Sequence, residues 1–145
     1  WKMKTILVVE DDKNQLFLYE QELSREGYHI ITAKDGLEAI KKVKEQLPDL
    51  IIMDITMPKM NGIEAMGKIL SEHKKIPVII NTAYSRYKDD FMSWSADAYI
   101  IKSSNLKELK DKIKELIWRF LIKKGVLASF RYKNAFRDYF SEATA

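Results

Sequence analysis

The sequence contains no cysteine and no apolar run long enough to cross a membrane. Without cysteine there is neither a disulfide framework nor a thiolate metal site, which fits a reducing cytoplasm. A spanning helix needs about 20 mostly apolar residues, so we expect no transmembrane segment, and we also expect no signal peptide. The two histidines, His29 and His73, stand alone and receive no role. These absences predict a cytoplasmic protein of one domain, for which 145 residues suffice.

An excess of charge of one sign is also missing from most of the chain. Residues 1–118 carry 19 Lys and Arg and 19 Asp and Glu. The net charge of +4 therefore comes from residues 119–145, which carry six basic and two acidic residues. The main body has no basic excess of the kind that binds nucleic acid, and we do not expect direct DNA binding.

Five short apolar runs predict the strands of a parallel sheet. None alternates cleanly between apolar and polar residues, and continuous apolar runs of this length are typical of strands buried on both faces. Helical patterns separate the runs, and right-handed crossovers then place helices on both faces of the sheet. The sequence therefore predicts a doubly wound, five-stranded α/β fold. The runs are ILVV (6–9), HIITA (29–33), LIIM (50–53), VII (78–80) and AYII (98–101).

Apolar stripes at helical spacing predict the helices. Asp12 is a candidate N-cap, with Gln15 three residues later as in a capping box, and Gly27 stands where a helix often ends. A third helix is predicted over about 63–72, and segment 86–95 is only weakly helical. The predicted inward residues are Leu16, Tyr19 and Leu23 in the first helix, Leu37, Ile40, Val43 and Leu47 in the second, Ile63, Met66 and Leu70 in the third, and Leu106, Leu109, Ile113, Leu116, Ile117 and Phe120 in the last.

Charged and polar residues stand where the predicted strands end. The carboxyl ends of parallel strands share one edge of a sheet, which is where ligands bind in such folds. We therefore expect three acids, a hydroxyl group and an ammonium group to lie together. The strand ends are Glu10-Asp11-Asp12, Asp54, Asn81-Thr82-Ala83 and Lys102-Ser103.

This set of groups predicts chemistry on a phosphoryl group. Clustered carboxylates repel one another, which raises their pKa values unless a cation neutralises them. As hard oxygen ligands without nearby His or Cys, they favour Mg²⁺, which retains several waters and can hold phosphate oxygens. Lys102 supplies a compact positive charge and Thr82 a hydroxyl donor for phosphoryl oxygens. Asp54 is then a candidate nucleophile that forms an aspartyl phosphate.

Four segments together resemble the receiver domain of two-component response regulators. They are VVEDD (8–12), IIMDITMPKMNG (51–62), NTA (81–83) and AYIIK (98–102), in the family's order and approximate spacing over residues 4 to about 120. The resemblance implies a flavodoxin-like, CheY-like sheet of order 2-1-3-4-5. It also implies a stand-alone signalling phosphoacceptor, which assists its own phosphorylation and dephosphorylation, rather than an enzyme.

The resemblance implies a role for each matching residue. Asp54 matches the phosphoacceptor, Asp11 the acid that binds Mg²⁺ directly, and Glu10 its neighbour, which often acts through water. Thr56 matches the position whose backbone carbonyl completes the metal site. Of the remaining matches, Thr82 is the switch hydroxyl with Ala83 after it, Lys102 contacts the phosphate, and Tyr99 is the aromatic side chain that turns inward.

The resemblance also implies partners. A histidine kinase or a phosphotransfer protein would donate the phosphoryl group. A downstream protein would bind the face formed by the helix at 86–95, the strand at 98–101 and the last helix. The sequence SWSADAY before that strand lacks the family's usual glycine and looks shortened, which puts the helix at 86–95 in doubt.

One departure from the family lies directly after the lysine. The family usually has proline there, commonly after a cis bond, whereas this chain has Ser103. A cis bond before a residue other than proline costs about 3 kcal/mol. We therefore predict either a strained cis Lys102-Ser103 bond or a rearranged loop.

The receiver is expected to span residues 1–121, followed by a basic, aromatic, amphipathic helical tail at 122–145. Three readings of this tail are open: it packs as an extra helix on the receiver or on a second copy, giving a homo-oligomer; it is foreign sequence from a fusion; or it binds nucleic acid or an anionic membrane surface. The alternative to a phosphorylation switch is an inert scaffold of receiver fold, or an engineered fusion, whose tail drives assembly.

Overall fold

The computed structural model describes residues 3–55, 57, 60–89 and 95–123. The chain divides into two compact units, residues 1–104 and 105–145, and each is considered by itself. Thr56 and most of the predicted tail, from residue 124 onward, lie outside the described residues. The proposed boundary between residues 121 and 122 therefore stays a prediction.

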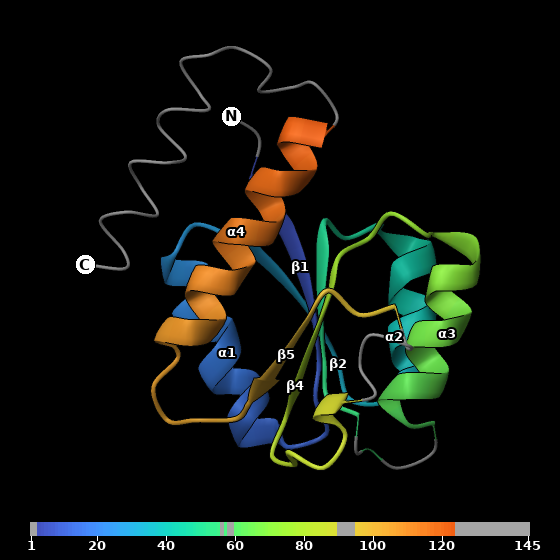
Figure 1. Ribbon diagram of the computed structural model, residues 1–145, viewed down its shortest axis with the longest axis horizontal. Helices are drawn as coiled ribbons and strands as arrows, with labels where there is room; N and C mark the ends of the chain where they lie inside the picture. Colours follow the sequence, from blue (N-terminus) through green and yellow to red (C-terminus); the bar gives the residue numbers. More distant parts are fainter. Residues whose placement is uncertain (1–2, 56, 58–59, 90–94, 124–145) are drawn as a thin grey trace. The chain divides into compact units, whose positions relative to one another are not determined.

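The first unit is built on a five-stranded parallel sheet (Figure 1). The strand order is β2-β1-β3-β4-β5, so the prediction of a doubly wound fold with order 2-1-3-4-5 is confirmed. Each strand falls on one of the predicted apolar runs. The strands are β1 (Thr5–Val9), β2 (His29–Ala33), β3 (Leu50–Met53), β4 (Val78–Thr82) and β5 (Ala98–Ile101).

Helices cover both faces of this sheet. Helix α1 (Lys13–Arg25) lies on one face, and helices α2 (Gly36–Glu45) and α3 (Gly62–Glu72) lie side by side on the other (Figure 1). The core between the sheet and these two helices contains Met53, Ile80 and Met66, all at most 1% exposed. At the sheet edge, β2 is only partly buried, unlike the central strands.

Two aspartates tie neighbouring strands together at their amino ends. Asp49 accepts a hydrogen bond from the backbone N–H of Thr5, which starts β1, at 2.8 Å. Asp97 does the same for Val78, which starts β4, also at 2.8 Å. Each carboxylate satisfies a partly buried backbone donor that would otherwise lack a partner at a strand start. The two bonds help to fix the strand register that aligns the carboxyl ends at the opposite edge.

Helix α1 begins as predicted but without a complete capping box. Asp12 accepts hydrogen bonds from the backbone N–H groups of Asn14 and Gln15, which confirms it as the N-cap. The second half of the box is wrong, because the backbone N–H of Asp12 donates instead to Glu10 Oε1 at 3.2 Å. The Gln15 side chain is thereby left to contact Tyr19. At the other end, Gly27 has the positive φ of +94° expected of a residue that ends a helix.

The predicted inward face of α2 is only partly right. Val43 is buried, but Leu37 and Leu47 are more than half exposed. The helix instead buries Ala39 and Gly36. Gly36 lies so close to the backbone of Met60 that a Cβ atom there would be 2.7 Å from the Met60 backbone oxygen, a contact that apolar spacing alone does not reveal.

The second unit contains helix α4 (Lys107–Lys123), which is the predicted last helix. The residues predicted to face inward are buried there, including Leu109, Ile113 and Leu116, whereas Phe120 is only partly buried. Segment 86–95 shows a turn and a short 3₁₀ stretch over residues 86–89, and residues 90–94 lie outside the described part of the chain. No helix within the described ranges is long and apolar enough to span a membrane.

Candidate functional site

Three carboxylates gather at the carboxyl ends of the two central strands β1 and β3. Glu10 and Asp11 directly follow β1, and Asp54 directly follows β3. One oxygen from each lies within 4.8 Å of the others. Glu10 and Asp54 are 2% and 5% exposed, whereas Asp11 is open to solvent. Two buried acids with an exposed third form a cluster that a cation can reach from the Asp11 side.

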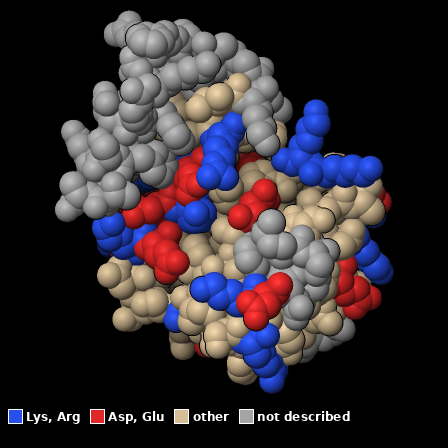
Figure 2. Space-filling model, in the orientation of Figure 1, with Lys and Arg blue, Asp and Glu red and all other residues tan. Residues whose placement is uncertain are grey.

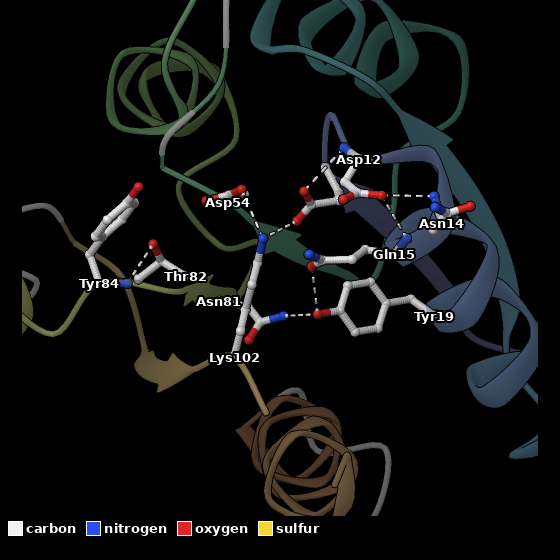
Figure 3. A network of polar contacts seen from close by, with 10 residues as sticks. Asp12, Asn14, Gln15, Tyr19, Asp54, Asn81, Thr82, Tyr84 and Lys102 are labelled. Carbon is white, nitrogen blue, oxygen red and sulfur yellow. Dashed lines mark hydrogen bonds and ion pairs between the residues drawn. The ribbon is translucent and has the colours of Figure 1, made fainter. Parts of the chain in front are cut away.

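Lys102 forms ion pairs with both buried acids. Its Nζ lies 2.6 Å from Glu10 Oε2 and 3.0 Å from Asp54 Oδ2, and Figure 3 shows it reaching across the sheet edge toward Asp54. Burial alone would lower the pKa of Lys102, but the hydrogen bonds and charges of Glu10 and Asp54 outweigh it and raise that pKa. No cis peptide bond occurs among the described residues, so of the two predicted alternatives the strained cis Lys102-Ser103 bond is wrong. The loop continues as a trans chain.

The surroundings of Glu10 disfavour the ionised form of its carboxyl group. Burial raises its pKa from an ordinary 4.5 to about 7. The charge of Asp54 adds to this rise, while the hydrogen bonds to Lys102 and to the backbone of Asp12 oppose it. Because the pKa of Glu10 is raised despite the adjacent ammonium group, a further positive charge at this site would stabilise the ionised carboxylates.

The polar residues predicted at the end of β4 lie within the strand rather than after it. Thr82 is fully buried, and its hydroxyl oxygen accepts a hydrogen bond from the backbone N–H of Tyr84 at 3.4 Å. Tyr99 points inward, is 8% exposed, and donates a short hydrogen bond to the backbone oxygen of Tyr84. Ala83 is exposed beside them. The loop after Thr82 is therefore held by both predicted switch side chains.

Gly62 lets the segment after Asp54 fold back on itself. Its N–H donates to the backbone oxygen of Ile55 at 3.2 Å. A Cβ atom at position 62 would collide with the backbone oxygen of Asp54 and lie 2.8 Å from the Cα atom of Ile55. Only glycine fits this approach, and the start of α3 is thereby packed against the backbone that carries Asp54.

One polar pair near the site was not foreseen from the sequence. Asn81 Nδ2 donates a 3.0 Å hydrogen bond to the hydroxyl of Tyr19, and that hydroxyl contacts Gln15 Oε1 at 3.5 Å (Figure 3). Tyr19 had been assigned to the apolar face of α1 without a polar role. An asparagine after Val78-Ile79-Ile80 in a central strand was the available signal, since a buried amide requires a partner.

Comparison with known proteins places this geometry in a family. A family model of the response regulator receiver domain matches residues 6–114. The chain belongs to this family. Receiver domains are signalling phosphoacceptors rather than classical enzymes, and the acidic cluster of Glu10, Asp11 and Asp54 is consistent with that activity.

Solved receiver structures share both fold and sequence with this chain. TrrA of Thermotoga maritima, solved in complex with Mg²⁺-BeF, is 48% identical with a TM-score of 0.75, and the match covers 79% of this chain and 99% of TrrA. TrrA has also been solved in complex with the histidine kinase ThkA. A CheY-like receiver protein of Methanospirillum hungatei is 31% identical with a TM-score of 0.80, covering 84% of this chain and 99% of that one.

Curated relatives are longer than this chain. The alkaline phosphatase synthesis transcriptional regulatory protein PhoP of Bacillus subtilis is 35% identical over 118 residues, which are 80% of this chain and 49% of PhoP. The response regulator ArlR of Staphylococcus aureus is 36% identical over 119 residues, or 81% of this chain and 54% of ArlR. The chain thus spans about half the length of these relatives.

The face of the molecule drawn in Figure 2 carries charges of both signs. On the face shown in Figure 2, Lys and Arg side chains alternate with Asp and Glu over the described residues, without a continuous basic patch. This distribution agrees with the balanced composition of residues 1–118.

Proposed function

We propose that Asp54 accepts a phosphoryl group from the phosphohistidine of a histidine kinase or a phosphotransfer protein. The observation that carries this proposal is the pairing of buried Asp54 and Glu10 with Lys102 beside exposed Asp11. An Asp54 carboxylate oxygen forms the new P–O bond as the P–N bond of the phosphohistidine breaks, and the bonding electron pair leaves on the imidazole nitrogen.

The carboxylate cluster fits Mg²⁺. Three carboxylate oxygens within 4.8 Å of one another form a hard, anionic donor set, and the exposed Asp11 leaves a route for a hydrated ion. Glu10, Asp11 and Asp54 would hold the ion, together with the backbone carbonyl of Thr56, a position outside the described residues. When bound, Mg²⁺ supplies charge neutralisation for the phosphoryl oxygens and orients them for in-line attack.

The chain's own groups complete the reaction. In the unphosphorylated protein the Lys102 ammonium group is paired with the carboxylates of Glu10 and Asp54. Once Asp54 has formed the P–O bond and lost its negative charge, this ammonium group donates a hydrogen bond to a phosphoryl oxygen instead. The hydroxyl of Thr82 donates to another phosphoryl oxygen and leaves the N–H of Tyr84. Because the Tyr99 hydroxyl is hydrogen-bonded to the backbone oxygen of Tyr84, a movement of the loop after Thr82 changes the environment of Tyr99.

This movement is the proposed output signal. Its readout surface would be the face formed by segment 86–95, strand β5 and the last helix, to which a downstream protein binds. The energy comes from contacts of Thr82 and Lys102 that exist only in the phosphorylated state. A cytoplasmic location is proposed with it, since a phosphoryl donor of the kinase type acts there.

The test is an intact-mass measurement after incubation with Mg²⁺ and acetyl phosphate. We expect a gain of one phosphoryl group, which EDTA abolishes and which the Asp54→Asn variant does not show. Asp12→Asn is the matched control, because Asp12 caps helix α1 and has no part in the proposed chemistry. A folded parent protein that gains no mass, or an Asp54→Asn variant that gains the same mass as the parent, would contradict the proposal.

A further inference from the structure

A buried hydrogen bond joins helix α1 to the strand that carries Thr82. Asn81 and Tyr19 are each 3% exposed, and the Asn81 amide donates to the Tyr19 hydroxyl at 3.0 Å. Sixty-two positions separate the two residues in the sequence. Figure 3 shows the pair below the ammonium nitrogen of Lys102, on the side away from Asp54.

Asn81 is connected to the reacting groups by a short path. The backbone carbonyl oxygen of the neighbouring Thr82 accepts a 2.8 Å hydrogen bond from the backbone N–H of Lys102. The side chain of the same Lys102 then reaches Asp54 at 3.0 Å. A shift of Asn81 would therefore move the adjacent Thr82 and its hydroxyl. Through the hydrogen bond from Lys102 N–H to the Thr82 carbonyl oxygen, it would also move the backbone that carries the Lys102 side chain.

The choice of residues indicates more than packing. A buried amide and a buried hydroxyl each need a partner, whereas an apolar pair of similar size would fill the same space without that requirement. The hydroxyl of Tyr19 also lies within the electrostatic field of the site: burial raises its pKa, and the charges of Lys102, Glu10 and Asp54 act on it as well. Directional bonding fixes one position of Asn81, which apolar contact does not.

We propose that Tyr19 is a positioning residue for phosphoryl transfer: through Asn81 it holds Thr82 and Lys102 in register with Asp54. This inference rests on the proposed function of Asp54. Tyr19 touches none of the reacting atoms, so its effect is confined to the alignment of groups on β4 and β5.

The test compares Tyr19→Phe, which removes only the hydroxyl, with the parent protein. Phosphorylation by acetyl phosphate at saturating Mg²⁺ should slow by about three- to tenfold, the range that corresponds to the loss of one neutral hydrogen bond. Asn81→Leu should slow the reaction similarly, and the double variant should be no slower than the slower single variant, because both remove the same bond.

Leu23→Val is the matched control for a general loss of stability. Leu23 is fully buried on the same helix and is apolar, so its shortening weakens packing without touching the Tyr19–Asn81 bond. Its phosphorylation rate should equal that of the parent under conditions in which all variants are folded. If Leu23→Val slows the reaction as much as Tyr19→Phe does, or if Tyr19→Phe reacts at the parent rate, the proposal is overturned.

Backbone amide NMR signals of the unphosphorylated protein give a readout that is independent of the reaction. In Tyr19→Phe the signals of Thr82 and Lys102 should shift, while in Leu23→Val they should not. Unshifted signals in Tyr19→Phe would overturn the positioning role. A parent protein that accepts no phosphoryl group would instead refute the proposed function, and the amide signals would still decide whether Tyr19 positions Thr82 and Lys102.

Discussion

Glu10→Gln is expected to make the protein more stable at neutral pH and above. The substitution keeps the size of the side chain and the acceptor for the backbone N–H of Asp12, but removes a buried charge. The pKa of Glu10 rises from 4.5 to about 7, mainly because the side chain is buried. At roughly 1.4 kcal/mol per pKa unit, this rise corresponds to about 3 kcal/mol of lost stability once the acid is ionised.

The sign follows from proton linkage. Between pH 4.5 and about 7 the folded state keeps the Glu10 proton that the unfolded state releases. The free energy of unfolding of the parent therefore falls as the pH rises through this window, relative to a variant without the acid. Because Lys102 loses one of its two carboxylate partners in the variant, we expect a net gain of about 1–3 kcal/mol at pH 8 and almost none near pH 4.5.

Urea unfolding of both proteins in EDTA, at several pH values between these limits, measures the difference directly. Glu20→Gln, at an exposed position of helix α1, controls for the removal of one negative charge and should change the free energy of unfolding by less than about 0.5 kcal/mol. A Glu10→Gln variant that is less stable than the parent at pH 8, or a difference that does not vary with pH, would refute the reasoning. It would mean that the Lys102 ion pair outweighs the burial of the carboxylate.

Three other substitutions test separate parts of the structure. Gly62→Ala should lower the free energy of unfolding by about 1–3 kcal/mol, because its Cβ atom would collide with the backbone of Asp54, and thermal unfolding would show no loss if that contact is absent. Asp97→Ala removes the acceptor for the N–H of Val78 and should cost about 1–3 kcal/mol in urea unfolding, whereas unchanged stability would mean that water replaces the carboxylate. Lys102→Met removes the ammonium group that pairs with Asp54 and Glu10, so added Mg²⁺ should raise the Tm of this variant more than that of the parent. An equal rise in both proteins would contradict the idea that Lys102 and Mg²⁺ compete for these oxygens.

The strands could be predicted because burial on both faces leaves a direct trace in the sequence, whereas their order was implied only by the resemblance to receiver domains. Runs such as LIIM at 50–53 admit few other structures, and parallel strands must bring their carboxyl ends to one edge. For that reason the sequence predicts that Glu10, Asp54 and Lys102 lie together, and the structure brings them together.

The errors arose where tertiary contacts decide the local structure. Leu37 fits an apolar stripe, yet α2 rotates to bring Gly36 against the backbone of Met60, and Leu37 is left exposed. The Gln15 side chain has the spacing of a capping box, but Glu10 occupies the backbone N–H that the box requires. A pattern within the helix cannot reveal that a side chain outside the helix accepts the hydrogen bond from the same backbone N–H.

The Tyr19–Asn81 bond shows the same limit over a longer distance. Tyr19 fits the helical stripe of α1, and Asn81 follows three apolar residues in β4. Each residue alone suggests either packing or a turn. Only the fold shows that the Tyr19 hydroxyl lies within hydrogen-bonding distance of the Asn81 amide.

The central claim is that Asp54 carries the phosphoryl group, and chemical mapping tests it most directly. After phosphorylation with acetyl phosphate and Mg²⁺, borohydride reduces an aspartyl phosphate to homoserine, which peptide mass spectrometry locates. The account predicts homoserine at position 54, absent without phosphorylation and absent in the presence of EDTA. Homoserine at Asp11 or Asp12, or a stable phosphate on a hydroxyl side chain with position 54 unmodified, would contradict it.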